Sequence, residues 1–232
     1  MIADRVAAVR ERIARAAARA GRAPADVTLV AVSKTFPGEA VREAFAAGVR
    51  DFGENKVQEA EGKIASLGDL RAAGARFHLV GHLQGNKVRK ALPLFDCIHS
   101  VDGEELAGRL ERGAEEHGVV LRVLIQVDLA GEATKHGVPE AGLFRLLEAV
   151  AGFEGLRVDG LMILPPFSDD PEAGRPHFRR LRELRDQALA RDLLRAPHLS
   201  MGMSHDLEPA IEEGATMVRV GSAIFGERER KA

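Results

Sequence analysis

Short apolar segments alternate with longer amphipathic segments along almost the whole chain of 232 residues. The apolar segments have the length and the β-branched content of buried strands, and they cover residues 27–32, 49–52, 77–80, 97–101, 121–129, 158–164, 198–200 and 217–220. The segments between them repeat apolar residues at helical spacing, at 39–47, 57–67, 86–92, 104–117, 140–150, 176–190 and 206–213. Eight strands separated by seven helices, with no hairpin turn between neighbouring strands, predict a parallel sheet.

A closed (β/α)8 barrel, or TIM barrel, is the simplest arrangement of eight such units, and we expect one α/β domain over residues 1–232. A doubly wound open sheet is the alternative, but the glycine fingerprint of a dinucleotide-binding fold is missing after the first strand. An extra helix precedes the barrel, because Ile2, Val6 and Ile13 lie at helical spacing and the pattern stops near Gly21 and Pro24. The arginines on its other faces are expected to be solvated rather than to bind a membrane or nucleic acid.

The composition narrows the class of protein. The net charge is −2, which indicates no polyanionic partner, and the single cysteine, Cys97, cannot form an internal disulfide. We therefore expect a cytoplasmic protein with a buried Cys97. The N-terminus lacks the apolar stretch of a signal peptide, and no apolar run approaches the length of a membrane span.

Lys34 ends the first predicted strand, directly before a turn at Phe36-Pro37-Gly38. A lysine at this position is either a surface residue or an amine placed at a site. A partly desolvated amine is a nucleophile for Schiff-base formation.

Polar residues also follow the other predicted strands. They occur in the segments Gly53–Lys56, Gly81–Lys87, His99–Asp102 and Asp128–Glu132. Active sites of TIM barrels are built from the loops at the carboxyl ends of the strands, so we expect these segments to gather around one site.

The last two strands predict a phosphate site. They run into the segments Ser200-Met201-Gly202-Met203-Ser204 and Gly221-Ser222-Ala223. Barrels commonly bind phosphate between these two loops, where bare backbone amides and hydroxyl groups act as donors. Gly202, Ser204, Gly221 and Ser222 supply both kinds of donor, although glycine and serine are also ordinary loop residues.

Arg219 lies inside the apolar run Met217–Val220. A guanidinium that faces the interior needs a hydrogen-bond acceptor as its partner, because it can only donate. The acceptor is a carboxylate, a phosphate or an unprotonated ring nitrogen, and Glu54 or Asp206 could supply it from within the chain. A lysine, a phosphate cup and an inward arginine together match pyridoxal 5'-phosphate (PLP). A Schiff-base aldolase would use only the first two.

The chain resembles the pyridoxal phosphate homeostasis proteins, single-domain relatives of the alanine racemase N-terminal barrel. The matching segments are AVSKTFP, FGENKVQE, HLVGHLQGNK, IHSVD, GLMILPP, SMGMSHDLEPAI and VRVGSAIFGER, which run over essentially the whole chain. The resemblance implies that Lys34 forms an internal aldimine with PLP and that Arg219 faces the pyridine nitrogen. It also implies that Ser204, Gly221 and Ser222 hold the phosphate and that Asn55 lines the cofactor. Asp128 and Phe77 depart from the family pattern, where asparagine and tryptophan are usual.

The resemblance implies a protein that holds, supplies or buffers PLP with little or no turnover, and that has PLP-dependent apoenzymes as transient recipients. A PLP-dependent, racemase-like enzyme acting on amino acids is the alternative, and a role through protein partners is a third reading. Arg219 would leave the ring nitrogen unprotonated and weaken it as an electron sink. The chain also has no tyrosine for a second acid/base, a role that His82 or His205 could take. We expect a monomer, because the second domain of the racemases is absent.

His78 and His82 are four residues apart, a spacing that suits a metal only on a helix. The sequence shows no third ligand, so we expect no metal site, with a packed His78 and a loop His82.

Overall fold

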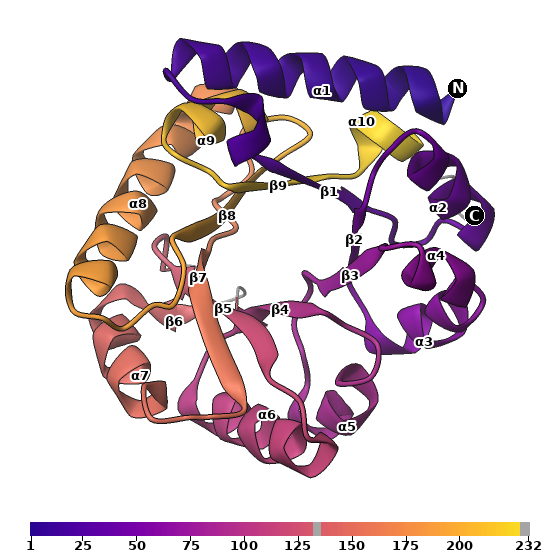
Figure 1. Cartoon of the computed structure of the whole chain (residues 1–232). Coiled ribbons are helices and arrows are strands. Elements are labelled where there is room, and N and C mark those ends of the chain that lie inside the picture. Colours follow the sequence, from indigo (N-terminus) through magenta and orange to yellow (C-terminus); the bar gives the residue numbers. More distant parts are fainter. Residues whose placement is uncertain (132–135, 228–232) are drawn as a thin grey trace.

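The computed structural model describes residues 1–131 and 136–227, and within them eight parallel strands close into a barrel with helices outside it (Figure 1). Each strand pairs in parallel with its neighbour around the ring, and the β1–β9 and β4–β5 pairings complete the closure. A two-residue strand, β6, continues beside the end of β5. The strands are β1 (Thr28–Val32), β2 (Asp51–Glu54), β3 (Arg76–Leu79), β4 (Cys97–Val101), β5 (Leu121–Asp128), β6 (Val138–Pro139), β7 (Leu156–Met162), β8 (His198–Met203) and β9 (Met217–Val220). The predicted TIM barrel is confirmed; Glu132, part of one predicted loop, lies outside the described residues.

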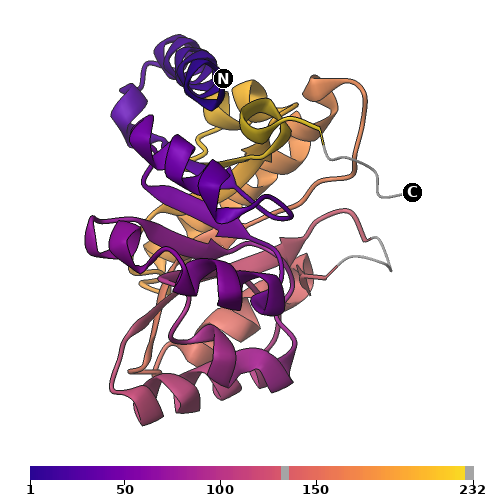
Figure 2. The ribbon, with the colours of Figure 1, turned by 90° about the vertical axis from the view of Figure 1, so that its right-hand side faces the viewer.

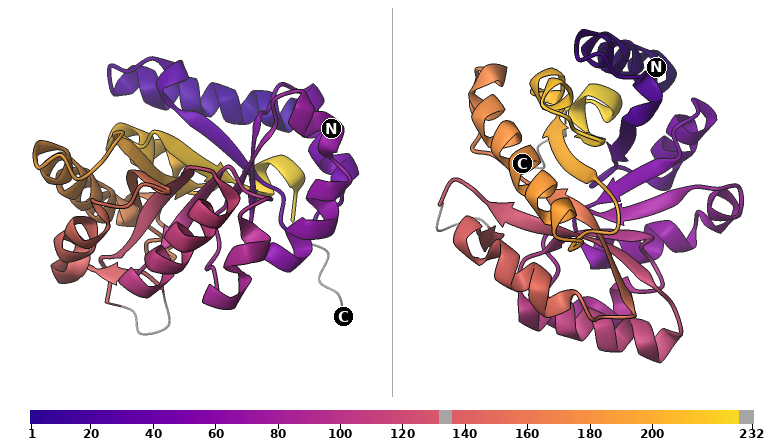
Figure 3. Two further views of the ribbon diagram at one scale, coloured as in Figure 1. Left: turned by 60° about the horizontal axis from the view of Figure 1, so that its bottom comes forward. Right: turned by 60° about the vertical axis from the view of Figure 1, so that its left-hand side comes forward.

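The helices alternate with the strands and surround them on all sides in the further views (Figure 3). The α-helices are α1 (Ile2–Arg19), α2 (Gly38–Ala46), α3 (Val57–Ala65), α4 (Gly68–Ala72), α5 (Val88–Ala91), α6 (Glu104–His117), α7 (Leu143–Val150), α8 (Arg175–Ala190), α9 (Leu207–Glu212) and α10 (Ser222–Phe225). Short 3-10 turns η1 (Pro24–Asp26), η2 (Gly85–Lys87), η3 (Glu140–Gly142) and η4 (Pro171–Gly174) precede β1, α5, α7 and α8. No helix among the described residues is long and apolar enough to cross a membrane.

Some predicted boundaries are wrong for local reasons. The second strand begins at Asp51 rather than at Val49, because Gly48 turns with φ +88° and the Val49 amide bonds back to Ala44 at 3.0 Å. The predicted helix 57–67 ends at Ala65 as α3, and a separate short helix, α4, begins at Gly68. Strand β7 ends at Met162, before two prolines that cannot donate to a sheet.

The extra N-terminal helix α1 lies outside the ring of strands, against the C-terminal part of the chain (Figures 1 and 2). It buries Val6, Val9 and Ile13, as its apolar spacing predicts. Its Arg12 forms a bidentate pair with Glu208, at 2.6 and 2.7 Å, so the helix is tied to α9 next to the barrel mouth.

Side chains of alternate strand residues face the barrel interior, while the others pack under the helices. The interior holds a small apolar cluster of Val30, Cys97, Leu124, Met162 and Met217, and a much larger core lies between strands and helices. Arg219 is two residues from Met217 on β9, so it faces the interior as predicted.

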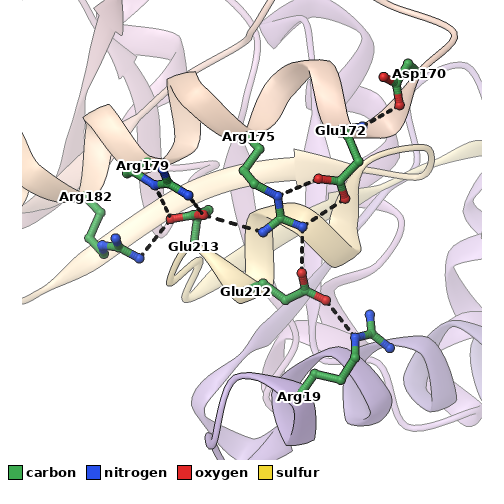
Figure 4. A network of polar contacts seen from close by, with 8 residues as sticks. All are labelled: Arg19, Asp170, Glu172, Arg175, Arg179, Arg182, Glu212 and Glu213. Atoms are coloured by element: carbon green, nitrogen blue, oxygen red, sulfur yellow. Dashed lines mark hydrogen bonds and ion pairs between the residues drawn. The ribbon is translucent and has the colours of Figure 1, made fainter.

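An ion network on the surface joins α8 to α9 and α1 (Figure 4). Arg175 contacts Glu172, Glu212 and Glu213, and Arg19 of α1 contacts Glu212 at 2.7 Å. Several charges shared in this way hold the outer helices to one another.

Candidate functional site

A cavity of about 830 Å³ opens at the carboxyl ends of the strands. Its wall includes all six residues predicted to hold the cofactor, namely Lys34, Asn55, Ser204, Arg219, Gly221 and Ser222. Arg219 belongs to β9, and the others follow β1, β2, β8 or β9. The fold therefore brings together residues from the first two and the last two strands of the barrel.

Lys34 lies two residues after the end of β1 and is partly buried in the cavity wall. Thr35 turns the chain sharply with φ +69°, an uncommon conformation for a β-branched residue. The preceding Ser33 is fixed on both sides, since its hydroxyl donates to Glu54 and its carbonyl accepts from Lys63, both at 2.7 Å. The backbone that carries the Lys34 amine is therefore held firmly.

Asn55 is placed by a close approach between the loops after β2 and β3. A Cβ atom on Gly81 would lie 2.2 Å from the Asn55 carbonyl oxygen, so only glycine fits there. The Gly81 carbonyl also accepts a hydrogen bond from Ser100 at 2.7 Å. This contact fixes Asn55 at the cavity wall.

Ser204 forms the centre of the predicted phosphate cup. Its hydroxyl accepts hydrogen bonds from the backbone amides of Gly221 and Ala223, at 3.2 and 3.3 Å. Arg12 of α1 donates to the Ser204 carbonyl at 3.0 Å, so the N-terminal helix supports this loop. The two loops after β8 and β9 therefore meet at one point, as the sequence predicts.

Two further residues support the cup from behind. Gly202 has φ +88° and packs against Ala210, where a Cβ would approach to 2.6 Å. It does not line the cavity, so its predicted role as a direct phosphate donor is wrong and its role is to allow close packing. Phe225 of α10 stacks on Phe36 with ring centroids 5.2 Å apart, which joins the cup to the turn after Lys34.

Arg219 is 4% exposed and faces the cavity. Its Nη1 donates to the Ser200 hydroxyl at 2.6 Å and its Nη2 to the Ile163 carbonyl at 2.8 Å. Burial lowers the pKa of Arg219 to about 10, with Asp206 acting in the opposite direction. The guanidinium therefore stays charged at neutral pH.

The carboxylates considered as internal partners of Arg219 have other roles. Glu54 accepts from Lys63 at 2.7 Å, and Asp206 accepts the Met203 amide at 2.6 Å. Among the described residues, the hydrogen bonds of Arg219 reach only neutral acceptors. Its charge thus remains available to a ligand in the cavity.

In the folded protein, His78 and His82 each lie in a separate group of three residues that could bind a metal ion. The sequence alone had shown no such third ligand. His78 lies beside Cys97 and His99. The Nδ1 atom of His78 is already hydrogen-bonded to His99, at 2.9 Å, and Asp51 lies 2.9 Å from the other nitrogen, so this group is a polar contact and not a metal site.

The second histidine, His82, lies beside Asp102 and His136. The rings of His82 and His136 are stacked at 3.6 Å and 9°. A metal ion lies in the plane of each imidazole that binds it, so one ion cannot serve two parallel stacked rings without a rotation.

Sequence reasoning missed the residues behind Arg219, above all Ser200 and His99. Both are fully buried. The sequence placed each of them in a segment at a strand end but gave neither a role beside Arg219. The alternation of β8 places Ser200 on the interior face, and this signal could have identified it.

The chain matches the family model described as alanine racemase, N-terminal domain, over residues 5–229. The curated pyridoxal phosphate homeostasis protein of Pseudomonas aeruginosa is 48% identical over 229 residues, 98% of this chain and 96% of that protein. The protein of the same name from Escherichia coli strain K12 is 43% identical and covers 98% of this chain and 97% of its own length.

This chain belongs to the pyridoxal phosphate homeostasis protein family. The structure of PipY from Synechococcus elongatus with PLP bound has a TM-score of 0.86 and 40% identity, and covers 97% of this chain and 100% of that chain. Alanine racemase from Corynebacterium glutamicum, with 21% identity and a TM-score of 0.67 over 96% of this chain and 62% of its own, shares the fold.

The two departures from the family pattern lie away from the cavity wall. Asp128 accepts the amides of Ala130 and Gly131, both at 3.0 Å, and so closes a turn after β5. Phe77 is fully buried and packs on Phe52 with ring centroids 6.0 Å apart. Neither substitution changes the set of residues around Lys34.

Proposed function

We propose that this protein binds PLP through Lys34 and takes part in intracellular PLP homeostasis, holding the cofactor and supplying or buffering it with little or no turnover. The observation that supports the proposal most strongly is the convergence of Lys34, Ser204 and Arg219 on one cavity. Family members carry this name, and the PipY structure contains PLP.

The cavity fits the chemistry of PLP at three points. When bound, PLP supplies an aldehyde, a phosphate and a ring nitrogen. The Lys34 amine suits the aldehyde, and the loop around Ser204, Gly221 and Ser222 suits the phosphate through backbone amides and hydroxyls. Arg219 suits an unprotonated ring nitrogen because it can only donate.

Asn55 would line the cofactor beside Lys34, since both side chains belong to the same wall. A cytoplasmic location, a monomeric state and PLP-dependent apoenzymes as transient recipients complete the proposal. Light scattering of the purified protein tests the monomer, and transfer of PLP to an apoenzyme, followed by the appearance of its activity, tests the recipient.

Reduction with borohydride tests the site directly. The full chain is loaded with PLP, its visible absorbance is recorded before and after reduction, and the adduct is located by peptide mass mapping. We expect a yellow band that disappears on reduction and an adduct on Lys34. Lys34→Ala should abolish both signals, whereas Lys56→Ala, a matched change in the next strand's loop, should leave them intact. Absence of the band in the wild-type protein would refute PLP binding.

A role in homeostasis predicts release. In cells that lack their own copy, the wild-type protein should restore the normal PLP and amino-acid pools, and Lys34→Ala should not. Equal pools with both forms would contradict the role even if the purified protein binds PLP.

A PLP-dependent enzyme acting on amino acids is the second candidate, and the position of His82 favours it. His82 lines the cavity, and its Nδ1 lies 3.3 Å from Asp102, so it could carry a proton beside the cofactor. Exchange of the amino-acid α-proton with deuterium from solvent, lost in His82→Gln, would support this candidate. The homeostasis proposal predicts no exchange above that of free PLP.

A further inference from the structure

A continuous chain of hydrogen bonds crosses the barrel interior and ends at Arg219. Ser200 Oγ accepts from Arg219 at 2.6 Å and lies 2.9 Å from His99 Nδ1. His99 Nε2 lies 2.9 Å from His78 Nδ1, and His78 Nε2 lies 2.9 Å from Asp51 Oδ1. All five residues are buried, and they come from β9, β8, β4, β3 and β2 in turn. The hydrogen-bonded chain therefore runs through the barrel interior from β9 by way of β4 to β2, and both of its ends lie on strands that pair with β1.

The two ends of this hydrogen-bonded chain together give it one direction, because the Arg219 guanidinium can only donate and the Asp51 carboxylate can only accept. A guanidinium only donates, so Ser200 accepts from it and its own hydroxyl proton is free to go to His99 Nδ1. A neutral His99 then carries its proton on Nε2 and donates to His78 Nδ1. By the same reasoning, His78 donates from Nε2 to the carboxylate of Asp51. Each bond then points away from Arg219 and towards Asp51.

The two ends of the chain carry opposite charges. Arg76 holds the far end by donating twice to the Asp51 carboxylate, both times at 2.7 Å. Burial alone would raise the pKa of Asp51, but the hydrogen bonds from His78 and Arg76 outweigh it and lower the pKa to about 2. Asp51 therefore remains an anion at neutral pH.

His99, in the middle of the hydrogen-bonded chain, is neutral. Burial lowers the pKa of His99 well below its ordinary value of 6.5, and the guanidinium groups of Arg219 and Arg122 act in the same direction. A neutral imidazole has one donor and one acceptor nitrogen, which is what a member of a one-directional chain requires.

We propose that Asp51, His78, His99 and Ser200 are positioning residues that orient the Arg219 guanidinium and support its charge through the barrel interior. The inference rests on the proposed function, because Arg219 is the residue assigned to the ring nitrogen of PLP. In the hydrogen-bonded chain, Nη1 of Arg219 donates to Ser200. Nη2 donates to Ile163, and the rest of the guanidinium faces the cavity. Bonds that polarise one another strengthen such an arrangement.

Nitrogen-15 NMR of labelled histidine tests the direction of the hydrogen bonds in the wild-type protein without any cofactor. At neutral pH, His99 should be neutral with its proton on Nε2, and the His78 proton that faces Asp51 should also be on Nε2. Assignment uses the loss of one signal in each single His→Gln variant. A proton on Nδ1 of either ring, in the apo protein, would overturn the one-directional chain.

A double-mutant cycle tests the coupling to Arg219. Asp51→Asn keeps an acceptor for His78 but removes the charge, and it should speed the release of PLP about fivefold, as expected for residues coupled in one network. Ser200→Ala cuts the chain, so Asp51→Asn should have less than a twofold effect in the Ser200→Ala background. Cys97→Ala, a buried interior change outside the chain, should leave the release rate within twofold.

The outcomes separate this inference from the proposed function. Loss of thermal stability without any change in PLP release, or the same effect of Asp51→Asn in both backgrounds, would reduce these residues to a structural role. If either variant does not fold, the tautomers measured in the wild-type protein still decide. A wild-type protein that binds no PLP refutes the proposed function, whereas normal binding with insensitive release refutes only the coupling.

Discussion

Arg175 and Arg219 show two opposite ways of holding a guanidinium in this fold. Arg175 lies in the surface network of Figure 4, against the carboxylates of Glu172, Glu212 and Glu213, and the hydrogen bonds that it donates to the first two raise its pKa. Arg219 is buried with a hydroxyl and a carbonyl as acceptors, and burial lowers its pKa to about 10. Paired charges stabilise the outer helices, whereas an arginine without a direct carboxylate keeps its charge for a ligand.

The largest expected effect comes from removing the buried charge. Arg219→Met should weaken PLP binding about 10- to 100-fold, the range for a hydrogen bond to a charged group. The apo protein should change in unfolding free energy by no more than about 1 kcal/mol, because an apolar side chain of similar volume relieves the burial of a charge. Absorbance titration and urea unfolding measure the two quantities. Arg175→Met is the matched control and should lower stability while leaving PLP affinity unchanged.

The next effect concerns the anion that joins the surface arginines. Glu213 is 5% exposed and contacts Arg175, Arg179 and Arg182. Glu213→Ala should lower the free energy of unfolding by about 1–2 kcal/mol, more than an isolated exposed pair contributes. Urea unfolding measures the loss. A parallel loss of PLP affinity in the folded variant would contradict the separation of the two regions.

The pH dependence of the free energy of unfolding distinguishes the buried hydrogen-bonded chain from the surface network. The native state keeps His99 neutral because its pKa is lowered well below 6.5, while the unfolded chain takes up a proton near that pH. The unfolded state then binds more protons, so stability falls as the pH drops below about 6.5, by roughly 1 kcal/mol per pH unit for one such group. His99→Gln should flatten the dependence between pH 6.5 and 5 by that amount.

The smallest effect is expected at the edge of the surface network. The side chain of Arg19 is 53% exposed and pairs with Glu212. Arg19→Ala should cost less than about 0.5 kcal/mol, the usual range for a solvated pair. A cost as large as that of Glu213→Ala would mean that α1 depends on this single contact.

The strand-and-helix alternation was sufficient to predict the barrel, because buried parallel strands and amphipathic helices leave separate periodic signals. Lys34 and Arg219 could also be found, since a charged residue at or inside an apolar strand is conspicuous. The two loops proposed to hold the phosphate could be placed from the ends of β8 and β9. These predictions depend on local pattern and on one general rule of barrels.

The chain behind Arg219 could not be predicted in the same way. His78, His99 and Ser200 come from three strands, and their contact depends on the stagger of strands around the ring. Local spacing carries no information on this, and it led us to consider His78 with His82 instead. The predicted start of β2 at Val49, rather than at Asp51, is also an error of local pattern. Val49 is buried although it lies in a turn, and a buried valine is typical of a strand.

The central claim is that Arg219, held by neutral acceptors, donates to an unprotonated ring nitrogen of bound PLP. The nitrogen-15 chemical shift of PLP labelled in the ring and bound to the wild-type protein at neutral pH tests it most directly. We predict the shift of an unprotonated pyridine nitrogen that accepts a hydrogen bond. The shift of a protonated pyridinium would contradict the claim and would point instead to an acid partner at that edge of the ring.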